Sequence, residues 1–201
     1  YTVVGATPCP AETGIVSVTV VSAPDAGTPG NATLCSTGAT IMLIDELGGT
    51  PDPGGSWTGP SIVTTGTFDP ATMQSGVYTY TIAVPPPCTN ATSTVNITVV
   101  QPPDAGTDGG LTLCATSGPT SLLTGLSGTP DSGGTWNGPS AVTGGNFDPG
   151  SMNMGSYTYT VPGNAPCPSA AAVVEVNVVD NPDPGGPGFI TLCSTDAAVD
   201  M

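Results

Sequence analysis

The sequence contains no lysine, arginine or histidine, although 15 of its 201 residues are aspartate or glutamate, so its formal net charge at pH 7 is −15. Without cationic side chains the chain cannot neutralise phosphates, and we expect nucleic acids and anionic membrane surfaces to be repelled. The chain also lacks the imidazole and amine groups that many enzymes use as general bases or nucleophiles. These absences exclude nucleic acid as a partner and argue against catalysis.

Long apolar runs are also missing. No stretch approaches the ~18 apolar residues of a membrane-spanning helix, so we expect no direct membrane insertion. Apolar and polar residues instead alternate in short runs rich in Val, Ile, Thr and Tyr, a pattern typical of half-buried β-strands. These runs are IVSVTVV at 15–21, VYTYTIAV at 77–84, VNITVV at 95–100, SYTYTV at 156–161 and VVEVNVV at 173–179. With 29 glycines and 23 prolines between the runs, the predicted class is all-β.

The chain repeats itself with a period of 79 residues, as GGSWTGPSIVTTGTFDP at 54–70 and GGTWNGPSAVTGGNFDP at 133–149 show. This period exceeds the ~20 to 50 residues of repeats that fold only by stacking on neighbours, so each copy is long enough to be a domain. We predict complete repeats at 24–102 and 103–181. Residues 1–23 then form the C-terminal part of a truncated repeat and 182–201 the N-terminal part of another, which indicates an excerpt from a longer chain.

Each repeat holds six or seven short predicted strands with turn residues between them, a pattern that predicts an immunoglobulin-like β-sandwich. We expect TIMLIDEL at 40–47 to be one of these strands. Short proline-containing linkers would join the domains into an extended rod. The aromatic residues are expected to form the two cores, and a buried tyrosine near the start of the penultimate strand resembles a tyrosine corner. The predicted core residues are Trp57, Phe68 and Tyr78 in the first repeat, and Trp136, Phe147 and Tyr157 in the second.

The six cysteines, two per repeat, indicate disulfides and an oxidising, extracytoplasmic setting. Zinc is disfavoured because no C-x-x-C pair and no histidine is present. One pairing lies within repeats and joins Cys35 to Cys88 and Cys114 to Cys167, which leaves Cys9 and Cys193 to pair outside the excerpt. The alternative spans the linkers: Cys9–Cys35, Cys88–Cys114 and Cys167–Cys193. We favour the first, because Cys88 and Cys35 are both expected at the end where the domain begins, whereas Cys88 and Cys114 are separated by a whole strand and a linker.

Carboxylates are the only other candidate site. We expect Asp69, Asp104 and Asp131 to converge at a junction between domains, where their oxygens would suit calcium. The alternative is that each aspartate caps its own turn beside Pro and Gly. No other cofactor is expected. A glycosidase with paired carboxylates is disfavoured, because a sandwich of 79 residues leaves little room for a cleft. The chain is therefore predicted not to be an enzyme.

The pattern PDAGTDGGLTLC…GTPDSGGTWNGP…FDP…GSYTYTV…APCP…VVEVNVV at 103–179, with its partner at 24–100, resembles the Ig-like tandem repeats of giant cell-surface adhesins of Bacteroidota. The SprB-like gliding-motility adhesins, exported by type IX secretion, are typical of that family. The resemblance implies a secreted surface filament that adheres to polysaccharide or to an abiotic substratum. It also implies contact with outer-membrane secretion or motility machinery and with neighbouring repeats of the same chain.

The leading hypothesis is therefore an extracellular, non-enzymatic adhesin filament at the cell surface, which supports adhesion or gliding. A second hypothesis is a structural surface fibre or S-layer-like component whose chains associate laterally. A third is a spacer array that holds an enzyme or a binding head outside this segment.

Overall fold

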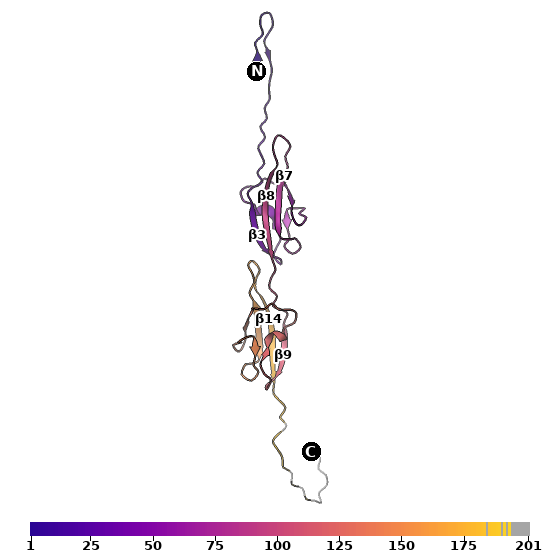
Figure 1. The fold of residues 1–201 in the computed structure, drawn as a ribbon, viewed down its shortest axis with the longest axis vertical. Coiled ribbons are helices and arrows are strands. Elements are labelled where there is room, and N and C mark those ends of the chain that lie inside the picture. Colours follow the sequence, from indigo (N-terminus) through magenta and orange to yellow (C-terminus); the bar gives the residue numbers. More distant parts are fainter. Residues whose placement is uncertain (184, 190, 192, 194–201) are drawn as a thin grey trace. The chain divides into compact units, whose positions relative to one another are not determined.

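The computed structural model describes residues 1–183, 185–189, 191 and 193 (Figure 1). The chain forms two compact units, Tyr1–Pro102 with Gly163–Pro168, and Pro103–Pro162 with the residues from Ser169 onward. The predicted partial repeat at 182–201 lies largely outside the described residues. Each unit contains one Ig-like β-sandwich, so the fold is all-β, with two such domains in tandem.

The first domain is built on a four-stranded sheet (Figure 1). Its strand order is β3 (Gly30–Cys35), β8 (Ala91–Val100), β7 (Gly76–Ile82) and β5 (Ser56–Thr58). The pair β3 and β8 is parallel, and the other neighbours are antiparallel. A second sheet pairs β4 (Ile41–Met42) with β6 (Thr67–Phe68). Phe68 of β6 packs edge-on against Tyr78 of β7 with ring centroids 5.3 Å apart, so the two sheets share one core.

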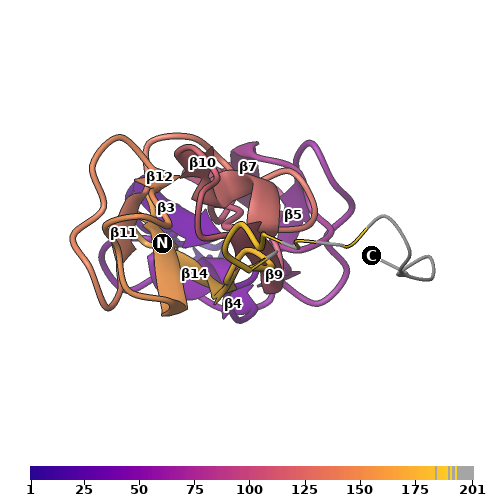
Figure 2. The same cartoon turned by 90° about the horizontal axis from the view of Figure 1, so that it is seen from below.

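The second domain repeats this arrangement. Its larger sheet has the order β11 (Thr135–Asn137), β13 (Gly155–Val161), β14 (Ala170–Val179) and β9 (Gly109–Cys114), and β9 is parallel to β14. The smaller sheet pairs β10 (Thr120–Ser121) with β12 (Asn146–Phe147), which lie side by side in Figure 2. Phe147 packs edge-on against Tyr157 as Phe68 does against Tyr78.

A buried tyrosine at the start of β7 and of β13 ties the core to the preceding turn. Tyr78 and Tyr157 are both 0% exposed. The Tyr78 hydroxyl donates a hydrogen bond of 2.7 Å to the Gln74 carbonyl, and the Tyr157 hydroxyl donates one of 2.6 Å to the Asn153 carbonyl. Both bonds run back four residues, which is the geometry of a tyrosine corner. Each buried phenol thereby satisfies its polar atom within its own domain.

Two predicted strands differ from the structure. Residues 40–47 form only β4, followed by a 3-10 helix, η1 (Leu43–Glu46). In a strand, Leu43, Asp45 and Leu47 would share one face, so a carboxylate would be buried between two leucines. The 3-10 turn buries Leu43 and Leu47 and leaves Asp45 exposed. The equivalent helix of the second domain, η2 (Leu122–Gly125), buries Leu122 in the same way.

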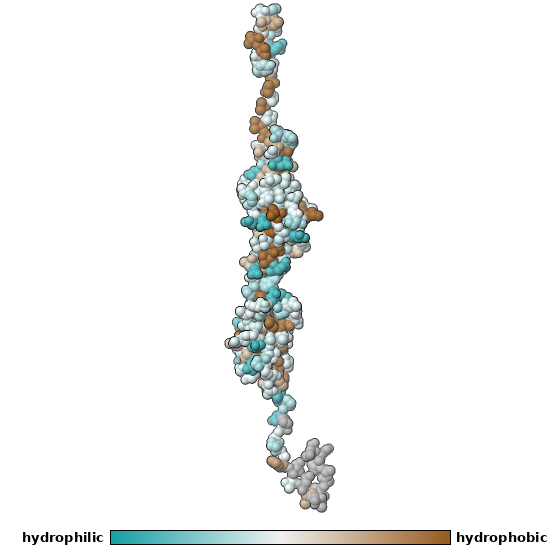
Figure 3. All heavy atoms as spheres, in the orientation of Figure 1, coloured by the Kyte–Doolittle hydropathy of each residue, from teal (hydrophilic) through white to brown (hydrophobic). Residues whose placement is uncertain are grey.

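The predicted strand at 15–21 is not formed. It follows a short hairpin of β1 (Thr2–Val3) and β2 (Glu12–Thr13), and its apolar residues are exposed, as the brown spheres of Figure 3 show. One period later, the same pattern forms part of β8, which hydrogen-bonds to β3 on one side and β7 on the other. In the described part of the chain, residues 15–21 have no paired strand, so their alternation buries nothing.

Among the described residues, the structure contains no helix with the length and apolarity to span a membrane.

Candidate functional site: a repeated tryptophan groove

Each domain carries one tryptophan on the edge strand of its larger sheet. Trp57 of β5 lies opposite Tyr80 of β7, with ring centroids 4.9 Å apart, and Trp136 of β11 lies opposite Tyr159 of β13 at the same distance. Both tryptophans are half-buried. Both were predicted to be core residues; they pack against the edge of each core, whereas their partners Tyr80 and Tyr159 are enclosed, at 1% and 2% exposure. Because β5 and β11 end their sheets, no further strand covers the indoles.

An open groove lies beside each tryptophan. In the first domain it has a volume of about 360 Å³, and its lining includes Trp57 and Tyr80 together with Met42, Pro53, Gly55 and Gly66. The groove of the second domain has a volume of about 520 Å³ and is lined by the residues one period later, among them Trp136, Tyr159, Gly134 and Gly145. Both volumes lie in the roughly 300–1,000 Å³ range of small-molecule sites. None of the described residues that line the two grooves is charged.

Tyr80 fixes the floor of the first groove through two hydrogen bonds. Its hydroxyl donates to the Asp52 carbonyl at 2.7 Å and accepts from the Gly55 N–H at 2.8 Å. A Cβ atom on Gly55 would lie 2.5 Å from the Tyr80 ring, so only glycine lets the backbone approach the phenol this closely. In the second domain, Tyr159 makes the same pair of bonds to the Asp131 carbonyl and the Gly134 N–H.

A second glycine lies beside the indole. Gly66 has a φ of +77°, in the left-handed region that favours glycine, and a Cβ there would lie 3.6 Å from Trp57 Nε1. Gly145 has a φ of +73° and the same relation to Trp136 Nε1. At both positions glycine leaves the edge of the indole free of a neighbouring side chain. The result is a neutral groove with an aromatic platform, which suits a ligand with a flat apolar face and hydrogen-bonding edges.

The linker aspartates form a backbone clasp with the TPD loops. The Asp104 N–H donates to Asp131 Oδ2 at 2.9 Å, and the Asp131 N–H donates to the Asp104 carbonyl at 2.7 Å. Asp104 Oδ1 also accepts from the Gly106 N–H at 2.7 Å. Asp25 and Asp52 make the same clasp in the first domain. The carboxylates of Asp104 and Asp131 are therefore already used to hold two backbone segments together.

Asp69 has a separate role as the cap of its own turn. Its Oδ1 accepts from the Ala71 N–H at 2.9 Å, and its Oδ2 accepts from the Thr72 hydroxyl at 3.0 Å. No group of three or more His, Cys, Asp or Glu side chains that could hold a metal is found in the described part of the chain. The predicted convergence of Asp69, Asp104 and Asp131 on calcium would involve both units, and the contacts within each unit do not test it. The alternative reading, in which each aspartate stabilises a turn, describes the contacts.

The structure also corrects the cysteine pairing. Cys35 forms a disulfide with Cys167, with their Cα atoms 4.9 Å apart, whereas Cys9, Cys88 and Cys114 are free thiols. The predicted pairs Cys35–Cys88 and Cys114–Cys167 are therefore wrong, and so are the alternative pairs across the linkers.

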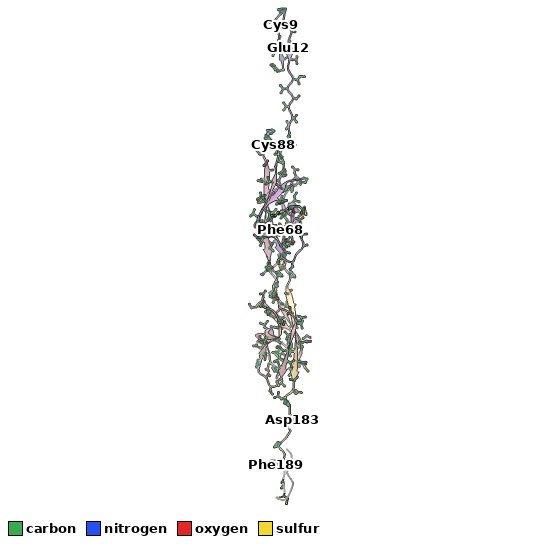
Figure 4. The ribbon with its side chains drawn as sticks, turned by 90° about the vertical axis from the view of Figure 1, so that its right-hand side faces the viewer. Cys9, Glu12, Phe68, Cys88, Asp183 and Phe189 are labelled. Atoms are coloured by element: carbon green, nitrogen blue, oxygen red, sulfur yellow. A yellow bond between two sulfur atoms is a disulfide. The ribbon has the colours of Figure 1, made fainter. Side chains whose placement is uncertain are left out.

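Strand direction explains the error. Cys35 lies opposite Val100 at the C-terminal end of β8, because β3 runs parallel to β8. Cys88 precedes Ala91, the first residue of β8, and Figure 4 shows it at one end of the first domain. The ten residues of β8 at about 3.3 Å each therefore separate the two cysteines by about 30 Å. A disulfide needs Cα atoms within about 7 Å.

Comparisons with known proteins found similar solved structures only, all at low sequence identity. No family model matches the chain, and no curated protein sequence matches it. One similar solved structure contains immunoglobulin domains 1–5 of Sidekick-1, with 17% identity and a TM-score of 0.28, over 78% of this chain and 41% of that one. The N-terminal four Ig domains of Dscam1 show 13% identity and a TM-score of 0.41, over 82% and 48%. An I-band fragment of titin shows 13% identity and a TM-score of 0.36, over 70% and 53%.

The chain thus spans about half the length of the solved chains that it matches. No enzyme family was found. Disulfide-bonded Ig-like domains indicate an extracellular or secreted protein.

Proposed function

We propose that the chain is part of a non-enzymatic, extracellular adhesive filament at the cell surface, and that the tryptophan grooves bind neutral polysaccharide. The observation that carries the proposal is the recurrence of one groove, with the same aromatic pair and the same two glycines, in both domains. An enzyme needs one site, whereas an adhesive gains from repeating a weak one. A role in gliding, and contact with secretion or motility machinery in the outer membrane, rest on the family resemblance alone.

The chemistry of the groove favours sugars. A pyranose ring offers an apolar C–H face, which can stack on the indole of Trp57, and a rim of hydroxyls, which can bond to threonine and backbone groups such as those of Thr64 and Thr65. The groove has no charged lining residue, and the chain as a whole carries a charge of −15. Both facts disfavour anionic ligands and favour neutral glycans.

Repetition supplies the affinity that a single shallow groove lacks. Two sites on one chain that engage one polymer act at an effective concentration set by the chain between them, so the combined binding exceeds that of either site alone. The two grooves lie one period of 79 residues apart in the sequence. A long polysaccharide is therefore a better ligand for this arrangement than a short oligosaccharide.

The proposal is tested with the two tryptophans themselves, which are the only ones in the sequence. Immobilised dextran, mannan and xyloglucan serve as neutral polysaccharides, alginate as an anionic one, and polystyrene as an abiotic surface. We expect binding to a neutral polysaccharide, a decrease of at least tenfold in Trp57→Ala/Trp136→Ala, and intermediate binding in each single variant. Ile62→Ala, which changes an apolar residue that is 89% exposed and does not line the groove, is the matched control.

Circular dichroism establishes that each variant keeps its β-structure before binding is compared. If the folded double variant binds as strongly as the unmodified chain, or if no neutral polysaccharide is bound, the groove is not the adhesive site. Binding to polystyrene alone would indicate adhesion to an abiotic substratum. A spacer without its own ligand would bind none of the probes.

A further inference from the structure

The disulfide connects consecutive copies of the sequence repeat. Cys35 ends β3 of the first copy, and Cys167 lies in the turn between β13 and β14 of the second, in the segment Gly163–Pro168 that belongs to the first compact unit. The bonded residues are 132 positions apart, which exceeds the 53 positions between Cys35 and Cys88 by one period of 79. The bond therefore joins the two cysteine positions of the repeat, one taken from each copy.

The other cysteines occupy the same two positions. Cys114 ends β9 as Cys35 ends β3, and Cys88 lies between β7 and β8 as Cys167 lies between β13 and β14. The surroundings recur as well: the sulfur of Cys167 lies 3.4 Å from the Val100 carbonyl, and that of Cys88 lies 4.0 Å from the Val21 carbonyl, one period earlier. Each repeat thus presents one cysteine for the copy before it and one for the copy after it.

We propose that this bond makes the chain a tension-bearing tether, because it carries force past the interior of both domains. When the chain is pulled from its ends, the shortest covalent route runs from Tyr1 to Cys35, crosses the disulfide and continues from Cys167 to Met201. That route contains 35 residues on each side of the bond. Residues 36–166 form a closed loop that the force does not reach, and they include every strand from β4 to β13.

The loaded segments gain little length when they are stretched. The domain strands on the route are β3 and β14, and a β-strand already extends about 3.3 Å per residue, close to the limit of the polypeptide chain. The strands can therefore transmit tension while they stay in their sheets. Unfolding of either core would release little extension, because β3 and β14 are already extended and the rest of each domain lies within the closed loop.

Single-molecule stretching of the 201-residue chain, tethered by peptide tags at its two ends, tests the proposal. At 3.3–3.6 Å per residue, the oxidised chain should reach a limiting length of about 230–250 Å with no domain-unfolding step. Chemical reduction, or Cys35→Ser, should restore two unfolding steps and add the 131 residues 36–166, or about 430–470 Å. Cys114→Ser, which removes a free thiol, is the matched control and should behave as the unmodified chain.

The limiting length of the oxidised chain distinguishes the Cys35–Cys167 bond from a bond within one repeat. A bond between Cys35 and Cys88 would hide only residues 36–87, so the oxidised chain would show one full unfolding step and a limiting length of about 490–540 Å. That result, or two steps in the oxidised chain, would overturn the proposal. Reduction of the unmodified chain between successive pulls supplies the comparison within one molecule, so the test does not depend on folding of the Cys35→Ser variant.

Discussion

The first domain buries a hydroxyl group that has no hydrogen-bond partner in the described structure. Ser93 of β8 is 4% exposed, and its Oγ atom makes no hydrogen bond there. The second domain has Ala172 at this position, 2% exposed and part of the core. An unpaired buried polar group costs about 1–3 kcal/mol in desolvation. We therefore predict that Ser93→Ala stabilises the first domain and that Ala172→Ser destabilises the second.

The expected magnitude follows from what the substitution removes. Alanine keeps the Cβ atom and loses only the oxygen, so we expect a gain of about 1 kcal/mol in the free energy of unfolding, at the lower end of the desolvation range. For a domain of this size, 1 kcal/mol corresponds to about 4–8 °C in Tm. With an m value near 1 kcal/mol/M, the urea midpoint should rise by about 1 M.

The two tryptophans allow each domain to be followed separately. In a Trp136→Phe background, the fluorescence of Trp57 reports urea unfolding of the first domain, and in Trp57→Phe the reporter is Trp136. The matched control is Thr92→Ala, an exposed neighbour on the opposite face of β8, which should change stability by less than about 0.5 kcal/mol. A lower midpoint in Ser93→Ala, or no loss in Ala172→Ser, would refute the desolvation argument.

Three further predictions concern the tyrosines, the carboxylates and the cysteines. Tyr80→Phe should destabilise its domain by about 2 kcal/mol and Tyr78→Phe by about 1 kcal/mol, because the first hydroxyl makes two hydrogen bonds and the second makes one; equal losses in urea unfolding would contradict this. EDTA and millimolar calcium should give the same Tm by calorimetry, since the carboxylates of Asp69 and Asp104 already cap backbone turns. A Tm that is several degrees higher in calcium would support the predicted calcium site instead. In a chain with residues 103–181 written twice, mass spectrometry after cleavage before aspartate should recover Cys114 bonded to the turn cysteine of the inserted copy; recovery of Cys114 as a thiol would restrict the bond to the first pair.

Sequence periodicity predicted the sandwich because alternation, turn residues and an exact repeat all indicated the same structure. The buried tyrosine corner was predicted for the same reason, since a tyrosine two residues into an alternating strand has one face available for the core. Residues 40–47 were harder to predict. Their apolar spacing fits a strand, and only the need to keep Asp45 out of the core selects the 3-10 turn.

The groove could not be predicted from the presence of tryptophan alone. A tryptophan between two cysteines is typical of an Ig core, but its burial depends on whether its strand is central or at an edge. Here β5 is the last strand of its sheet, which follows from the pairing order and not from its own residues. The sequence nevertheless contained one signal of an open indole. Gly54 and Gly55 before β5 and Gly66 after it have no side chains that could cover Trp57.

The disulfide was missed because the strand directions were unknown. Because β3 runs parallel to β8, Cys35 lies at the end of the domain opposite to Cys88. Six cysteines allow 15 pairings, and their spacing in the sequence does not show the direction of β3. The exact period was nevertheless informative. When each repeat offers two cysteines at opposite ends of one domain, geometry leaves the neighbouring copies as the available partners.

The position of the grooves relative to the disulfide connects the two proposals. An adhesive filament is placed under tension whenever the surface to which it is bound moves, and a groove built by Trp57 over Tyr80 survives only while its sheet stays folded. Every residue that lines either groove lies within 36–166, the loop that the disulfide removes from the covalent load path. We therefore expect the oxidised chain to keep binding polysaccharide at forces that abolish binding by Cys35→Ser. The two chains should bind equally at zero force, because the bond touches no groove residue. A loss of binding at the same force in both chains would show that the ligand leaves before the domains unfold, and that the disulfide protects the fold without protecting adhesion.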